Sequence, residues 1–143
     1  MTRRALLLTG MCLGILPALG VVWAQEKTVG TPSASSLAEI KKAVVAASGY
    51  DDEAVELKAG PHQIEVAVAN GKLLDASRAA RVNEANRIVG AVAKAIAGKP
   101  EFASVDAVHI DYIRRNIASG HVDLVDAIDF RKDPSGDFKY HIS

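Results

Sequence analysis

Apolar positions recur along the chain at two different intervals, and these intervals separate helices from strands. Spacings of three and four residues, typical of a helix with one buried face, appear over residues 36–48 and 75–97. Alternation of apolar and polar residues, typical of a strand with one buried face, appears in five shorter runs. These runs cover residues 54–59, 63–69, 105–113, 122–130 and 138–142. The pattern therefore predicts the element order α-β-β-α-β-β-β.

Both expected helices carry signals at their ends. Ser36 and Glu39 have the spacing of a capping box, and Gly49 supplies a stop for the first helix. The second helix is expected from about Asp75, which can cap its start, to Ala97. Its predicted apolar seam consists of Val82, Ala85, Val89, Val92 and Ile96.

Short connections between the strands favour antiparallel pairing for most of them. The first two strands flank Gly60 and Pro61, which is typical of a hairpin. If all apolar strand positions face the helices, the two helices must lie on the same side of the sheet. The predicted fold class is thus α+β, a two-layer sandwich with a mainly antiparallel five-stranded sheet and both helices on one face.

The start of the chain has the three parts of a secretory signal. Arg3 and Arg4 precede an apolar run over residues 5–23, which ends with small residues before Gln25. We expect residues 1–24 to be cleaved, residues 25–34 to form a flexible leader, and residues 35–143 to form a single α+β domain. The alternative is an uncleaved anchor, which would be the chain's only contact with a membrane. Either way the sequence predicts an exported protein, periplasmic or secreted.

Cleavage changes the composition in ways that exclude some functions. Of 143 residues 119 remain, and 15 basic residues stand against 17 acidic ones, a net charge of −2. This balance gives no electrostatic attraction to nucleic acid. The single cysteine, Cys12, falls in the signal, so a cysteine-free mature domain has neither disulfides nor thiolate chemistry. Nothing in the sequence calls for a cofactor.

Alternation also predicts which polar side chains face away from the helices. The last three strands place two histidines, three carboxylates and two cations on one outward face. These candidate site residues are His109, Asp111, Asp123, Asp129, Arg131, Lys139 and His141. Asp126 alternates with Leu124 and Ile128 and so points inward, where a carboxylate needs a partner or a bulge.

Three hypotheses about the function follow. No residue is assigned a catalytic role, because no nucleophile motif is present. The leading one is a non-enzymatic binding domain whose partner is another protein or a second copy of the chain. The second is a metal-dependent or acid–base enzyme centred on His109 and Asp111, with His141 as a third candidate metal ligand. The third is a site for a small apolar ligand between the helices and the sheet.

Overall fold

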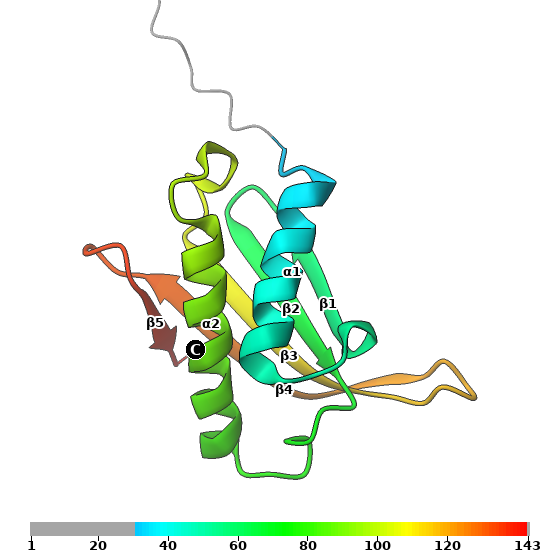
Figure 1. Cartoon of the computed structure of the whole chain (residues 1–143). Coiled ribbons are helices and arrows are strands. Elements are labelled where there is room, and N and C mark those ends of the chain that lie inside the picture. Colours follow the sequence, from blue (N-terminus) through cyan, green and yellow to red (C-terminus); the bar gives the residue numbers. More distant parts are fainter. Residues whose placement is uncertain (1–30, 143) are drawn as a thin grey trace, which may run out of the picture.

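The computed structural model describes residues 31–142 (Figure 1). The predicted signal peptide and most of the predicted leader lie outside these residues. The two helices are α1 (Ala34–Ser48) and α2 (Arg78–Ile96). The five strands are β1 (Val55–Ala59), β2 (Gln63–Ala69), β3 (Ala107–Arg115), β4 (Val122–Lys132) and β5 (Phe138–His141). The predicted α+β class and the predicted element order are both confirmed.

The strands form one sheet in the order β1-β2-β3-β4-β5. Pairs joined by short loops are antiparallel, as expected for hairpins. β2 and β3 are parallel, because α2 crosses between them over one face of the sheet. Figure 1 shows α1 and α2 side by side on that face, while the opposite face carries no helix of the described chain.

Local hydrogen bonds fix where each helix begins, and both starts differ from the prediction. The hydroxyl of Ser33, three residues before the expected Ser36, caps α1 by accepting from the Ser36 amide. Ser77, not Asp75, caps α2 by accepting from the amide of Ala80. The predicted stop of α1 is confirmed, since Gly49 has a φ of 70° and its N–H bonds the Val45 carbonyl.

The core lies between the helices and the inner face of the sheet. Val108, Ile110 and Tyr112 of β3 point into it and are fully buried, as alternation predicted. The helices contribute a second set of fully buried side chains, namely Ile40, Val44, Ala85, Ile88 and Val92. Of the predicted α2 seam, Val82 alone lies at the margin of this core.

A register shift in the β3–β4 pair changes which side chains of β4 face the core. Tyr112 pairs with Asp126 but Ile113 pairs with Leu124, so Val125 is an extra residue in the ladder. Because one extra residue reverses the alternation, Val122 and Leu124 turn away from the core and are 47% and 62% exposed. The prediction that they face inward with Ile128 is wrong for this reason.

Two further observations complete the fold. Ile142 follows the end of β5 and is exposed, so it does not extend the inward set as predicted. Within residues 31–142, neither helix combines the length and the hydropathy required to cross a lipid bilayer.

Candidate functional site on the open face of the sheet

The strand registers align five polar side chains in one row across the face opposite the helices, which we call the open face. Each member of this row pairs with the next on the neighbouring strand. From β1 to β5 the row reads Lys58, Glu65, His109, Asp129 and His141. Three of the predicted site residues thus lie next to one another, and the other two members come from strands that the prediction left out.

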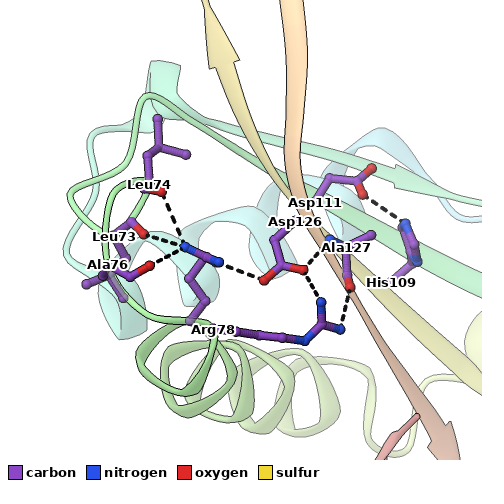
Figure 2. Close-up of polar contacts among 9 residues, drawn as sticks. Leu73, Leu74, Ala76, Arg78, His109, Asp111, Asp126 and Ala127 are labelled. Atoms are coloured by element: carbon purple, nitrogen blue, oxygen red, sulfur yellow. Dashed lines mark hydrogen bonds and ion pairs between the residues drawn. The ribbon is translucent and has the colours of Figure 1, made fainter. Parts of the chain in front are cut away.

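His109 lies at the centre of the row and contacts two carboxylates. Its Nδ1 is 2.7 Å from Oδ1 of Asp129, and its Nε2 is 2.9 Å from Oδ1 of Asp111. Figure 2 shows His109 directed at Asp111 along the sheet. An ionised carboxylate only accepts hydrogen bonds, so His109 satisfies both contacts when both ring nitrogens carry protons. The arrangement favours the imidazolium form.

The pKa of His109 reflects opposing effects. Partial burial taken alone lowers it, because a charged ring loses solvation. The hydrogen bond with Asp129 and the charges of Asp111 and Asp129 act in the other direction and together outweigh burial. The pKa of His109 is therefore raised above its ordinary value, because the two carboxylates stabilise the protonated ring more than burial disfavours it.

This geometry bears on the metal and acid–base hypotheses. Asp111 and Asp129 approach opposite ring nitrogens of His109, so the three side chains do not converge on one point. His141 is separated from His109 by the whole of strand β4, about twice the ~4.8 Å spacing of neighbouring strands. Across residues 31–142, no three His, Cys, Asp or Glu side chains are grouped to hold a metal ion.

The other predicted site residues divide between the two faces. Arg131 and Lys139 pair with each other in the row next to His109 and belong to the open face. Asp123 does not belong to it, which corrects the prediction. Asp123 pairs with Arg114, which follows Tyr112 by two residues and therefore points to the same, inner side of β3. Arg114 contacts Asp75, which precedes α2. The extra residue Val125 causes this reversal.

One end of the open face is apolar. Beyond Asp111 the outward positions are occupied by Ile113 and Arg115 of β3 and by Leu124 and Val122 of β4, and the loop that joins β3 to β4 presents Ile117. We call the four apolar residues Ile113, Leu124, Val122 and Ile117 the hairpin patch. Figure 1 shows that the β3–β4 hairpin projects sideways from the sheet, beyond the part that the two helices cover. Val122, Leu124 and Ile117 are the exposed members of the patch, whereas Ile113 is 8% exposed. The row that contains Asp111 lies between the patch and the charged row.

Sequence reasoning identified Asp126 as an inward carboxylate but not its partners. Its oxygens accept from Nη1 of Arg78 at 2.6 Å and from Nε of Arg81 at 2.8 Å, so α2 supplies two cations (Figure 2). Arg81 also donates to three carbonyls of the loop before α2, those of Leu73, Leu74 and Ala76. The sequence did contain a clue to these partners, because Arg78 and Arg81 are three residues apart and therefore lie on one side of the helix.

Glu84 was missed altogether. It lies on the inner side of α2, one turn before Ile88, and is completely buried. The hydroxyl of Tyr50 donates to its Oε2 at 2.9 Å, while Oε1 has no hydrogen-bond partner and lies 3.9 Å from Nη2 of Arg87. Burial, together with the hydrogen bond to the Glu84 carboxylate, raises the pKa of Tyr50 well beyond its usual range. Its complete burial and its hydrogen bond with Tyr50 indicate a structural role for Glu84.

The sequence matches no protein-family model and no curated protein, and the chain matches no solved structure.

Proposed function

We propose that this protein is an exported, non-enzymatic binding domain that docks another protein through the open face of its sheet. The observation that carries the proposal is the hairpin patch, where the extra residue Val125 turns Val122 and Leu124 out of the core. Exposed apolar side chains gathered on a projecting hairpin are typical of protein-interaction sites.

The surroundings of the hairpin patch fit the anatomy of such interfaces. An apolar centre is bordered by polar groups that hold the register and exclude alternative partners. Here the border is the charged row with His109, together with Arg115, which contacts Glu56 across the sheet. The partner that suits this face presents an apolar segment flanked by charges of both signs.

Site-specific photo-crosslinking in the cells that produce the protein tests the proposal. A photoreactive residue in place of Leu124 should crosslink to one defined protein, and the same residue in place of the exposed Ile142 should not. Val122→Asp should abolish the crosslink, because it places a charge in the apolar centre. A product of twice the chain mass would identify a second copy as the partner. A lack of any Val122-dependent product would overturn the proposal.

The acid–base alternative retains one supporting observation, the contact between His109 and Asp111. Both ring nitrogens of His109 are occupied by carboxylates, which leaves no nitrogen to accept a proton from a substrate. An activity that is lost in His109→Gln while the crosslink at position 124 persists would favour the enzyme over the binding domain.

A further inference from the structure

We infer that the protein holds a small amphipathic anion, an apolar chain or ring with one carboxylate, in a groove at the C-terminal end of α2. The groove has a volume of about 450 Å³ and is distinct from the open face. It lies between the end of α2, the 3₁₀ helix η2 (Pro100–Phe102) and the turn that joins β4 to β5. Its volume falls in the range of sites for small molecules.

The floor of the groove is apolar. Ile96 of α2, Phe102 of η2 and Phe138 of β5 contribute to its lining, and small residues such as Ala93 and Ala97 keep it open. Water in contact with such a lining is released when an apolar ligand enters, which favours binding. The groove therefore suits the hydrocarbon part of a ligand.

Lys132 supplies the charge that selects an anion. Its ammonium donates one hydrogen bond, to the Val105 carbonyl at 2.7 Å, and lies 5.1 Å from the centre of the Phe138 ring. An ammonium has three N–H donors, so two remain for a carboxylate. Within residues 31–142 Lys132 forms no ion pair, although it is only partly exposed.

The other charged groups around the groove are already engaged. Lys99 pairs with Glu39 of α1. In the β4–β5 turn, Asp133 accepts from the amides of Ser135 and Asp137, and Asp137 contacts Lys139. Lys132 is thus the cation of the groove that has no carboxylate partner among the described residues.

Calorimetric titration of the purified protein with octanoate and with octanol tests this inference. The two probes share their apolar chain and differ in charge. We expect octanoate to bind about tenfold more tightly than octanol, since a charge-assisted hydrogen bond contributes about 1.5 kcal/mol or more. Equal affinities for the two probes, or no binding of octanoate, would overturn the inference.

Two variants test separately the contribution of the Lys132 charge and that of the apolar groove to binding. Lys132→Gln should remove the preference for octanoate, and Ala97→Trp should block both probes because it fills the groove while leaving Lys132 in place. Lys139→Gln, which changes an exposed cation of the open face, should leave both affinities unchanged. Should Lys132→Gln fail to fold, Ala97→Trp decides the matter: octanoate binding that survives this exposed substitution shows that the groove is not the site.

Discussion

Arg81 of α2 and Asp126 of β4 form an ion pair of 2.8 Å in which both side chains are largely buried, at 11% and 5% exposure. Their contact links the helical layer to the strand next to the register shift. A buried pair of this kind is costly to break, because the surviving partner keeps its desolvation penalty without compensation.

We predict that Asp126→Ala lowers the free energy of unfolding by about 3 kcal/mol or more, since it leaves Arg81 without its counter-charge. Urea denaturation monitored by circular dichroism measures this loss. Asp75→Ala, which removes an exposed ion pair with Arg114, serves as the control and should leave the midpoint nearly unchanged. Similar midpoints for the two variants would contradict the role given to Asp126.

His109 should make stability depend on pH in one direction. Because its pKa is raised in the folded state, its stabilising contribution is full below the ordinary pKa of about 6.5 and is lost as pH rises through the folded value. Wild type should therefore exceed His109→Gln in melting temperature by more at mildly acidic pH than at alkaline pH.

The contribution of Asp129 to the raised pKa of His109 can be tested directly. Asp129→Asn removes a hydrogen-bonded carboxylate and should lower the pKa of His109, measured by NMR titration of the imidazole. A pKa of His109 that does not move in this variant would show that Asp129 is not its partner in solution.

For Glu84 we predict that Glu84→Gln is at least as stable as wild type. Glutamine keeps an acceptor for the Tyr50 hydroxyl and removes a net charge from a fully buried position. Tyr50→Phe, in contrast, should destabilise by about 1–3 kcal/mol because it leaves a second carboxylate oxygen without a donor. A marked loss of stability in Glu84→Gln would instead show that the ion pair with Arg87 is essential.

Two glycines offer a matched pair with opposite outcomes. A methyl group at Gly71 would come within 2.9 Å of the Tyr50 ring and of Val68, so Gly71→Ala should destabilise by roughly 1–3 kcal/mol. Gly90 lies within α2 with open space around it, so Gly90→Ala should stabilise by about 1 kcal/mol. Thermal melts of both variants measure the signs, and a Gly71→Ala variant at least as stable as wild type would refute the packing of Tyr50 on Gly71.

Most of the fold could be predicted from the sequence because the periodic patterns are local. The β1–β2 hairpin and the inward set of β3 each follow from alternation within one short run. The register shift at Val125 was not located this way. The inward phase of Asp126 called for a partner or a bulge, but alternation alone does not show whether a bulge exists or which residue is the extra one. The error at Asp123 and the missed exposure of Leu124 share that single cause.

The candidate site was predicted in part. Alternation placed His109, Asp111 and Asp129 on one face, but their contacts depend on cross-strand register. The partners on β1 and β2 were missed because the parallel pairing of β2 with β3 was not foreseen. Glu84 was missed because the predicted seam was built from apolar residues alone, so a charged residue on the inner side of the helix was not considered.

The parallel pairing of β2 with β3 also has a consequence for the order of folding. This pairing joins the β1–β2 hairpin to the β3–β4–β5 meander, and each of these two parts is closed by short turns. Because α2 lies between β2 and β3 in the chain, the two strands can pair only after this whole segment has folded back over the sheet. We expect the two parts to form early and to unite late, since pairing across a long loop is entropically slow. Until they unite, the inner edges of β2 and β3 remain open to strands of other chains, and this central seam is where misassembly should begin.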